Sequence, residues 1–401
     1  MSDTLPATVP ARLRAARAAV AACFFTNAVL YANLVPRLPE VKDRLDLTNA
    51  TLGAALAALP LGSLVSALAA AALMRRFGSA RVASWGLVAL AAAVWAAAVA
   101  PSWWLLAGAL FVAGALDAVV DVAQNAHGLR VQRAYDRSIL NAFHGVWSIG
   151  AVAGGLLGSV AAGLRVPLGL HLGVVAVVFA GLSLLAYRRM LPGPDHDDAG
   201  ADAAPEQAGG GAVRAALPAL AALGVLATAG AFVEDAGASW SALYLRGEIG
   251  VGAATAGLGF VALQVAMTVG RLTGDRVVDR FGQRRVARVG GALIALGTGL
   301  ALALPSLGTT LAGFALAGLG VATLVPAVYK AADELPGLRH GVGLTVVNWL
   351  LRVGFLASPP LIGAVADASG LRVALTAVVV AGVVTLVLGR VLARSVSRSA
   401  A

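Results

Sequence analysis

The stretch GLGFVALQVAMTVGRLTGDRVVDRFGQRRV, residues 257–286, decides the fold. Its first part is an apolar run, and its second part is a dense group of Asp and Arg residues. A run of about 20 apolar residues is long enough to cross a bilayer core of about 30 Å. The stretch therefore predicts a membrane helix that leads at once into a charged loop at the membrane surface.

The same pattern occurs in the first half of the chain. When residues 48–82 are shifted by 204 positions, Gly53 falls on Gly257 and Arg76-Phe77-Gly78 falls on Arg280-Phe281-Gly282 without a gap. The shift is about half of the 401 residues, so the chain reads as a duplication. Internal repeats of membrane helices are common in secondary transporters.

The composition indicates an integral membrane protein. The chain is 59% hydrophobic and only 12% charged, and its mean hydropathy is +0.84, whereas soluble domains carry about 25% charged residues. The single cysteine, Cys23, excludes an internal disulfide and a Cys-based metal cluster. No P-loop, HExxH or GxSxG motif is present, so we expect no enzyme, no catalytic residues, no metal and no cofactor.

Apolar runs separated by charge clusters or by Pro and Gly predict about twelve helices and an all-α membrane fold. These runs lie near residues 17–36, 49–74, 82–100, 103–128, 139–163, 168–187, 215–245, 253–274, 287–304, 307–330, 341–366 and 373–393. Residues 191–214 are rich in Gly, Ala, Pro and Asp and predict a flexible linker. We therefore expect one six-helix bundle over 1–190 and a second over 215–401.

The distribution of cations predicts the orientation in the membrane. Threading the spans alternately places 23 of the 30 Lys and Arg residues on the side of the N-terminus. Because loops rich in Lys and Arg stay in the cytoplasm, we expect a multi-pass protein of the cytoplasmic membrane with both termini cytoplasmic. The net charge of +10 then reflects topology and does not indicate nucleic-acid binding.

The fourth predicted span carries three polar residues on one face. Asp117, Asp121 and Asn125 recur every four residues, which stacks them along the helix. A charged side chain at the centre of a membrane helix costs roughly 2.5–3.5 kcal/mol, so such residues face a cavity or a partner. We expect this stripe to line a cavity; alternatively, Asn125 and His127 lie in the cytoplasmic interface, and Asp121 only caps the helix or pairs with Arg130.

Arg352 lies about 11 residues into the eleventh span, which is roughly 17 Å at about 1.5 Å per residue and close to the membrane midplane. A buried cation needs a counter-charge. We expect Asp117, Asp121 or Glu234 as its neighbour. Arg352 would then bind solute or take part in proton coupling; alternatively, it would only join two helices through a structural ion pair.

The seventh span carries two adjacent acids, Glu234 and Asp235. Neighbouring side chains point about 100° apart on a helix, so we expect at most one of them, Glu234, to face the cavity. The alternative is that both lie at the outer interface beside Trp240, where solvated acids and a Trp belt are common.

The first span is expected to match the seventh. Aligning Phe25 with Phe232 sets Asn27 against Glu234 and Asn33 against Trp240. The first half then offers neutral amides where the second offers an acid and an aromatic ring. This difference favours a polar, uncharged solute.

The fifth span combines a histidine with small residues. His144 could relay protons, because histidine titrates near neutral pH; the alternative is a packing role near the inner interface. Gly150, Gly154 and Gly158, spaced by four, predict a seam for close helix contact.

The charged loop over residues 275–285 resembles the cytoplasmic G-x-x-x-D-R-x-G-R-R signature of the major facilitator superfamily. The resemblance implies two pseudo-symmetric six-helix bundles that carry a small solute by alternating access. In the first copy Arg75 stands where the signature has Asp. We expect the loop to latch one conformation, with Asp279 at the helix start near Ser138 or paired with Arg137; alternatively, the loop only fixes topology. The expected latch residues are Asp275, Asp279, Arg280, Gly282, Arg284 and Arg285.

Within that superfamily the fourth and fifth spans look like a bacterial inner-membrane branch related to fucose permeases. Asp121 and Asn125 match the pattern of an acid four residues before an Asn, which implies proton-coupled sugar uptake. A second acid is expected four residues before Pro36, but Ala32 stands there. This departure weakens the sugar assignment and a coupling scheme that uses two acids.

The sequence therefore predicts a monomeric, proton-coupled transporter of a small polar solute in the lipid bilayer. The expected proton-coupling residues are Asp121, Asp117, Glu234 and His144. The expected solute contacts are Asn27, Asn33, Asn125, Trp240, Gln264, Asn348 and Arg352. Two alternatives stay open, namely efflux of drugs or metabolites by proton antiport and a non-transporting membrane receptor.

Overall fold

The computed structural model describes residues 10–66, 69–135, 139–193, 210–336, 338 and 341–392, without the side chains of residues 210–215. This part of the chain is almost entirely helical and contains no strand. Within it, twelve helical segments are long and apolar enough to cross a membrane. The predicted all-α membrane fold with about twelve spans is confirmed.

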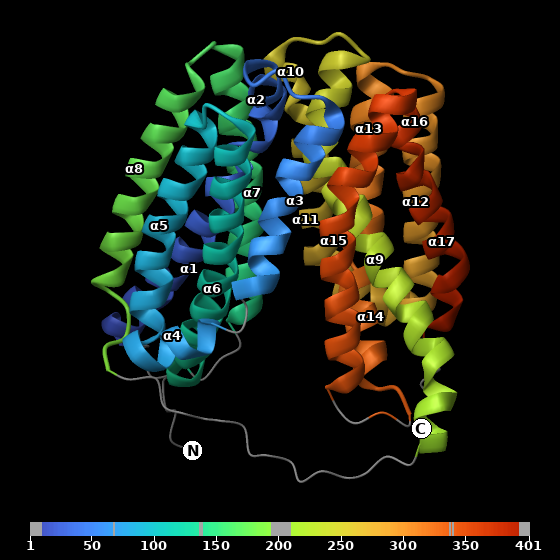
Figure 1. Cartoon of the computed structure of the whole chain (residues 1–401). Coiled ribbons are helices and arrows are strands. Elements are labelled where there is room, and N and C mark those ends of the chain that lie inside the picture. The colour runs from blue at the N-terminus through green and yellow to red at the C-terminus, as the bar shows by residue number, and fades with distance from the viewer. Residues whose placement is uncertain are drawn as a thin grey trace, which may run out of the picture.

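The helices of the first half precede residue 190 (Figure 1). They are α1 (Ala11–Ala32), η1 (Val35–Arg37), α2 (Leu38–Arg44), α3 (Asn49–Ser66), α4 (Ala69–Phe77), α5 (Ser79–Val99), α6 (Trp103–Tyr135), α7 (Leu140–Gly163) and α8 (Leu168–Tyr187). Those of the second half are α9 (Gly210–Gly247), α10 (Ala253–Ala256), α11 (Leu258–Phe281), α12 (Gln283–Ala303), α13 (Leu307–Val321), α14 (Leu324–Asp333), α15 (Val342–Ser369), α16 (Leu371–Ala374), α17 (Thr376–Leu388) and η2 (Gly389–Val391).

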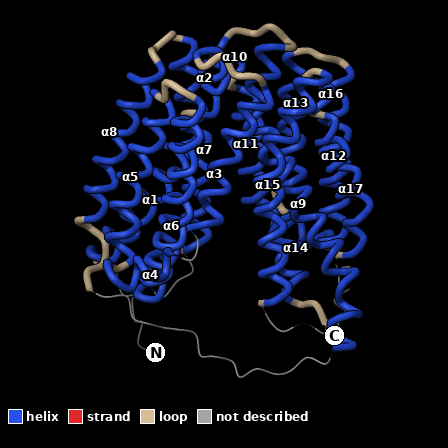
Figure 2. The backbone as a smooth tube through the Cα atoms, in the orientation of Figure 1, coloured by secondary structure: helices blue, strands red, loops and turns tan. Residues whose placement is uncertain are grey.

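The two halves form two helical bundles that stand side by side, with loops confined to the ends of the helices (Figure 2). The helix starts follow local signals: Pro167 precedes α8, and Ser306 with Thr309 forms a capping box at the start of α13. Large apolar side chains such as Val177 and Leu296 remain exposed on the outer faces, as expected for surfaces that contact lipid.

The predicted charged loop over residues 275–285 is wrong, because α11 continues to Phe281 and α12 begins at Gln283. Only Gly282 separates these two helices, as Gly78 separates α4 from α5, and this turn has the same backbone in both halves. The helices α5 and α12 begin and end 204 residues apart, in agreement with the repeat in the sequence. Gly78 has φ 80° and ψ 149°, and Gly282 has φ 82° and ψ 148°. Only glycine adopts this conformation without strain. The glycine of the repeated Arg-Phe-Gly turn is therefore required by the backbone in both copies.

The halves contact each other at the end of the molecule away from the chain termini (Figure 1). At that end α3 packs on α15 so closely that a Cβ atom at Gly53 would lie 2.2 Å from the carbonyl oxygen of Pro359. The carboxylate of Asp367 accepts hydrogen bonds from the backbone N–H groups of Asn49 and Ala50, both at 2.8 Å. We call this end the closed end.

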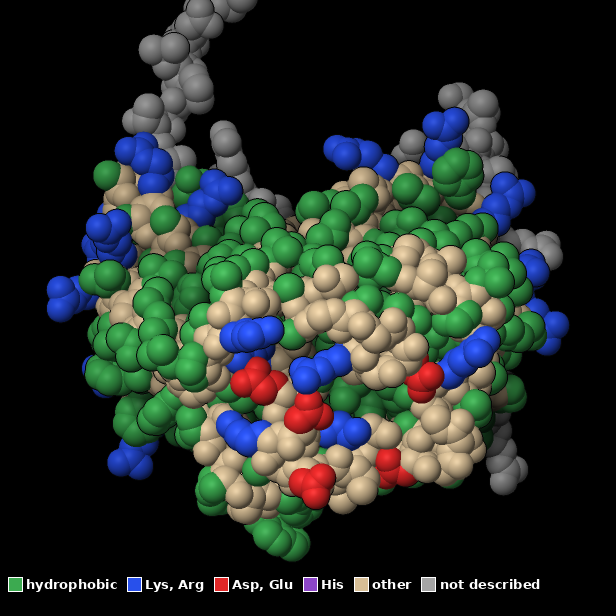
Figure 3. All heavy atoms as spheres, turned by 90° about the horizontal axis from the view of Figure 1, so that it is seen from above, with side chains coloured by type: hydrophobic (Ala, Val, Ile, Leu, Met, Phe, Trp, Pro, Cys, Tyr) green, Lys and Arg blue, Asp and Glu red, His purple; other side chains and the backbone are tan. Residues whose placement is uncertain are grey.

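An ion pair also joins the halves at the closed end, where Arg246 lies 3.0 Å from Asp43. Seen from this end, basic and acidic side chains lie close together over the middle of the molecule (Figure 3). Charges of both signs mixed in this way favour contact between the two bundles, because opposite charges attract across the interface.

The predicted glycine seam packs α7 against α1 within the first half. A Cβ atom at Gly150 would lie 2.6 Å from the carbonyl oxygen of Phe25, and one at Gly158 would lie 2.5 Å from that of Asn33. The other half is contacted from a different face of α7, where Gly155 lies against the ring of Phe260. Glycines on two faces thus let α7 approach both bundles.

Candidate solute cavity between the two halves

A cavity of about 510 Å³ lies between the bundles and is lined from both of them. Its polar lining residues are Asn27, Tyr31, Ser63, Asp117, Trp147, Glu234, Asp235, Ser239, Gln264, Tyr329, Asn348 and Arg352. Its apolar lining residues are Ala28, Ala32, Val35, Leu56, Leu59, Pro60, Leu90, Val94, Ala113, Ala151, Ala238, Phe260, Leu351 and Phe355. A lining of fourteen apolar and twelve polar residues can hold a small molecule that has both apolar and polar groups.

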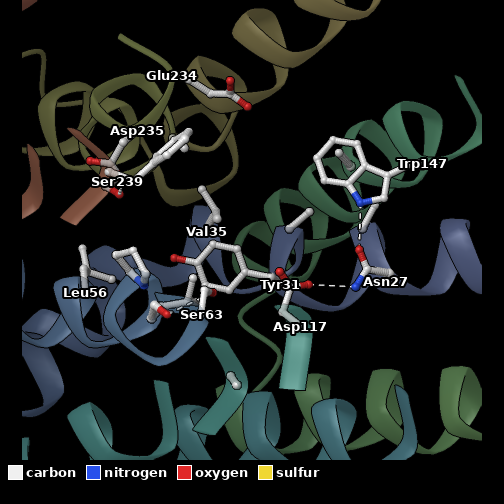
Figure 4. A pocket seen from close by; sticks show the side chains of 18 of the residues that line it. Asn27, Tyr31, Val35, Leu56, Ser63, Asp117, Trp147, Glu234, Asp235 and Ser239 are labelled. Carbon is white, nitrogen blue, oxygen red and sulfur yellow. Dashed lines mark hydrogen bonds between the residues drawn. The ribbon is translucent and has the colours of Figure 1, made fainter. Parts of the chain in front are cut away.

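In the first half, three helices are joined by hydrogen bonds through one amide. Asn27 donates through Nδ2 to Oδ1 of Asp117 at 2.8 Å and accepts through Oδ1 from Nε1 of Trp147 at 2.8 Å (Figure 4). Because its donor and its acceptor are both engaged, the amide can take only one orientation. These two hydrogen bonds hold the carboxylate of Asp117, on α6, against α1 and α7 at the cavity wall.

In the second half, both acids of α9 line the cavity, so the expectation that at most one would face it is wrong. Glu234 lies 3.4 Å from the guanidinium of Arg271, and Asp235 accepts a hydrogen bond from Ser239 at 3.1 Å. The two carboxylates point in different directions in Figure 4. A cavity that extends around one side of α9 can receive both, although they are about 100° apart on the helix.

Arg352 lines the cavity from the second half. It forms no ion pair with a carboxylate of the described residues, although its charge acts on Asp117 at longer range. The expected ion pair with Asp117, Asp121 or Glu234 is absent, and Glu234 is paired with Arg271 instead. A cation and a carboxylate held apart in one cavity leave a site between them for a polar solute or water.

Two further cavity residues hold each other in place. The hydroxyl of Tyr329 donates to Oδ1 of Asn348 at 2.8 Å, and both side chains line the cavity as does Arg352. Gln264 lines it as well and is only 5% exposed. The predicted contacts Asn27, Gln264, Asn348 and Arg352 therefore meet at one cavity.

The lower part of the polar stripe on α6 lies outside the cavity. Asp121 is exposed and accepts hydrogen bonds from Asn125 at 3.0 Å and from Gln124 at 3.3 Å. Neither Asp121 nor Asn125 lines the cavity, although Asp117 one turn earlier does. The spacing placed all three on one face correctly, but the cavity covers only the first of them.

His144, Asn33 and Trp240 also lie away from the cavity lining. His144 is exposed, and its ring meets that of Phe24 edge to face with centroids 5.2 Å apart. Asn33 is fully buried, donates to the carbonyl oxygen of Val29 at 2.8 Å and contacts His171 at 3.2 Å. Because its amide is engaged within the first bundle, Asn33 is not available to a solute in this structure.

The prediction that Trp240 contacts the solute came from an incorrect alignment of the first and seventh spans. Gly150 packs on Ala28, and Gly354, its counterpart 204 positions later, packs on Ala231. The helices α1 and α9 therefore correspond at a shift of 203. The predicted shift of 207 is wrong by about one helical turn, and it assigned Trp240, which is fully buried, to the cavity.

The expected latch lies at the end opposite the closed end. Asp275 and Asp279 are exposed and form no hydrogen bond or ion pair with another described residue. Arg280 lies over the ring of Phe281 at 5.5 Å. The expected partners of Asp279 at positions 137 and 138 lie outside the described residues, so the latch stays a prediction.

Several cavity residues were missed in the sequence. Tyr31 lies four residues after Asn27, and Ser239 lies four residues after Asp235, so both share a helix face with a polar residue of interest. That spacing is a signal that could have found them. Trp147 had no such signal, because its role depends on the approach of α7 to α1.

In the part of the chain that the structure describes, six spans of each half enclose a polar cavity between the bundles, which is the arrangement of a membrane solute carrier. A sequence profile described as Major Facilitator Superfamily matches residues 20–244 and 220–400. The chain belongs to the major facilitator superfamily of membrane transporters, as the charged loop predicted.

Related sequences agree with this assignment. The uncharacterized transporter y4wD of Sinorhizobium fredii is 30% identical over 359 residues, which cover 88% of this chain and 92% of the relative. The membrane protein MosC of Rhizobium meliloti is 30% identical over 370 residues, which cover 91% of this chain and 87% of the relative. None of these names denotes an enzyme, in agreement with the sequence prediction.

Solved structures share the fold. A bacterial homologue of the human lysosomal transporter Spinster, in an inward-facing and unoccupied conformation, matches with a TM-score of 0.75 and 16% identity over 95% of this chain and 98% of the other. The nucleoside transporter NupG matches with a TM-score of 0.71 and 13% identity over 93% of this chain and 97% of the other. The transporter FucP, in the outward conformation, matches with a TM-score of 0.60 and 18% identity over 93% of this chain and 97% of the other.

Proposed function

We propose that this transporter moves a small polar solute across the cytoplasmic membrane by alternating access and couples that movement to protons. The observation that carries the proposal is the cavity of about 510 Å³ into which the first half brings Asp117 and the second half brings Glu234, Asp235 and Arg352. Ionisable groups inside a membrane protein mark substrate or proton pathways.

Asp117 and Asp235 are the proposed proton-coupling acids, in place of Asp121, which the sequence analysis listed first. Each lines the cavity from a different half. A carboxylate that loses water is disfavoured relative to the neutral acid, so the proton on each acid responds to whether the cavity is wet or closed. Protonation of Asp117 also weakens its attraction to Arg352 in the other half. Proton binding and bundle movement are thereby linked.

The amides around the acids favour a solute with hydroxyl or carbonyl groups. Asn27, Gln264 and Asn348 line the cavity together with Arg352, and amides both donate and accept hydrogen bonds. Two of the solved structures with this fold are titled as a nucleoside transporter and a fucose:proton symporter. We propose a neutral, hydroxyl-bearing solute such as a nucleoside or a sugar.

The same proposal includes the arrangement in the membrane. Both termini and the linker lie in the cytoplasm, the bundles predicted over 1–190 and 215–401 are the two moving parts, and a monomer is the working unit. The helix α9 begins at Gly210, so the linker predicted over 191–214 does not extend to residue 214. The excess of Lys and Arg at the end of the termini supports this orientation. The closed end then faces outward.

Transport by purified protein tests the proposal. A thermal-shift screen of nucleosides and sugars would first select a solute, and uptake into proteoliposomes would then be measured with and without an inward proton gradient. Asp117→Asn is expected to lower uphill uptake by about 10- to 100-fold, whereas Asp121→Asn is the matched control and should retain it. Full uphill uptake by Asp117→Asn would refute proton coupling at this residue.

A second candidate is efflux of amphipathic aromatic compounds by proton antiport. Five of the 26 cavity residues are aromatic, namely Tyr31, Trp147, Phe260, Tyr329 and Phe355, whereas the whole chain is only 6% aromatic. Expression in a drug-sensitive host would separate the two functions. Resistance that Asp117→Asn removes would favour efflux, and unchanged sensitivity with solute-dependent growth would favour uptake.

A further inference from the structure

A second hollow, of about 730 Å³, lies on the surface of the second half at the end of the termini. It is lined by Phe281, Arg284, Arg285, Arg288, Val289, Ala292 and Leu386. It shares no residue with the cavity between the halves. Its ligand is therefore a separate question from the transported solute.

Positive charge dominates the lining. Three of its seven residues are arginines, and none is acidic. Arg288 is held in place, because its Nε donates to the carbonyl oxygen of Leu386 at 3.2 Å. Arg284 and Arg285 form no hydrogen bond or ion pair with another described residue. Guanidinium groups that converge in this way match the planar, multi-oxygen geometry of a phosphate.

The helix that carries the arginines adds to the field. The helix α12 begins at Gln283 with no side chain capping its start. Its first N–H groups and the positive end of its dipole therefore lie beside the arginines. These groups strengthen an anion site that the three side chains already define.

Below the arginines the hollow is apolar. Val289 is 58% exposed, and Ala292 follows one turn deeper on α12, opposite Leu386 of α17. A basic rim above an apolar floor, at the point where a membrane helix leaves the bilayer, matches a phospholipid, which has a phosphate at the surface and acyl chains beneath it.

We propose that this hollow binds an anionic phospholipid, with its phosphate held by Arg284, Arg285 and Arg288 and an acyl chain lying along Val289, Ala292 and Leu386. The occupant is a membrane lipid because a free phosphate ion would leave the apolar floor uncovered. The lipid bridges α12 and α17, so its binding stabilises the second half.

The first half supplies a natural comparison. At a shift of 204, Arg284 corresponds to Ala80, Arg288 corresponds to Ser84, and Arg285 corresponds to Arg81. One arginine therefore remains of three. Arg81→Gln removes a cation from the same turn of the duplicate and is the matched control for substitutions in the hollow.

Native mass spectrometry of the detergent-purified full chain tests the proposal. Phosphatidylglycerol, phosphatidylcholine and inorganic phosphate are titrated separately into the wild type, the triple variant Arg284→Gln, Arg285→Gln, Arg288→Gln, and Arg81→Gln. Each cation near an anionic lipid strengthens binding about fivefold. The triple variant is therefore expected to bind phosphatidylglycerol roughly 100-fold more weakly than the wild type does. The Arg81→Gln variant should bind phosphatidylglycerol as the wild type does, and the triple substitution should leave phosphatidylcholine binding unchanged.

Three results would overturn the assignment. The triple variant binds phosphatidylglycerol as well as the wild type, or Arg81→Gln loses as much binding as the triple variant, or inorganic phosphate displaces the lipid at equal concentration and thus marks a free-phosphate site. If the triple variant does not fold, the single variant Arg284→Gln replaces it, with an expected loss of about fivefold.

Discussion

The two halves of this transporter share a frame but differ in chemistry. The helices α5 and α12, and the glycine turns before them, coincide at a shift of 204. At the matching shifts of 203 and 204, none of the four charged cavity side chains has a charged counterpart in the other half. Asp117 matches Val321, Arg352 matches Ser148, Glu234 matches Tyr31 and Asp235 matches Ala32. The two halves therefore share the scaffold and differ in the charges that they bring to the cavity.

The clearest backbone difference coincides with a proline that the first half has and the second half lacks at the matching position. The first helix is interrupted after Ala32 and continues through η1, which contains Pro36, whereas α9 is continuous from Gly210 to Gly247. At the shift of 203, Ser239 stands where the first half has Pro36. Proline lacks the N–H that a helix interior needs. Without it α9 stays helical, and the Ser239 hydroxyl reaches Asp235 one turn earlier.

The largest test of this comparison exchanges the acids for amides in each half. We expect Asp117→Asn and Asp235→Asn each to lower gradient-driven uptake in proteoliposomes by about 10- to 100-fold, the range of coupling between linked sites. Exchange without a gradient should persist. If only one variant lost uphill uptake, coupling would belong to that half alone.

A second test concerns the cation that only the second half provides. Arg352→Gln keeps hydrogen-bonding groups but removes the positive charge from the cavity lining, and it should weaken solute binding about 10-fold. Isothermal titration with the solute selected by the screen would measure this. Arg271→Gln removes the partner of Glu234 and is a useful control, because a similar loss there would indicate general disruption of the cavity.

A third test asks whether replacing the glycine of the turn costs the same stability in both halves. Alanine in place of Gly78 or Gly282 must adopt a positive φ with extended ψ, which costs about 1–3 kcal/mol. Both variants should lower the thermal unfolding midpoint by a similar amount. A difference between them would show that the two turns are not equivalent in energy, despite dihedral angles that agree within 2°.

The smallest effect is expected at the closed end. Asp367→Asn replaces a charged acceptor with a neutral one at the N–H groups of Asn49 and Ala50. The site is exposed, so the population open at that end should rise by less than about fivefold. Distances between spin labels on α3 and α15 would report this. An unchanged distribution would mean that backbone packing alone holds the contact.

The sequence predicted the frame well because the signals are local. Apolar length defined the twelve spans, and the glycine of the Arg-Phe-Gly turn was marked by its repetition at 78 and 282. Helical spacing also placed Asp117 correctly on a polar face. Apolar length and helical spacing depend only on residues near one another in the chain, and the repeat can be read directly from the sequence.

The site was predicted only in part because a cavity is a property of packing between helices. The limit of the cavity between Asp117 and Asp121 depends on where the bundles separate, which spacing along α6 cannot reveal. The choice of Glu234 over Asp235 rested on the angle of about 100° between neighbouring side chains, but the cavity is lined by both. The alignment that selected Trp240 rested on one matched phenylalanine, and the contacts of Gly150 and Gly354 corrected it.

The seal at the closed end is formed from main chain as well as side chains. A Cβ atom at Gly363 would lie 2.3 Å from the carbonyl oxygen of Asn49, just as one at Gly53 would meet Pro359. Such a barrier cannot be released by a change of rotamer. Whole helices must separate, a movement that takes microseconds to milliseconds, so a rigid molecule that wedges between α3 and α15 would hold the transporter open and act as a conformational inhibitor.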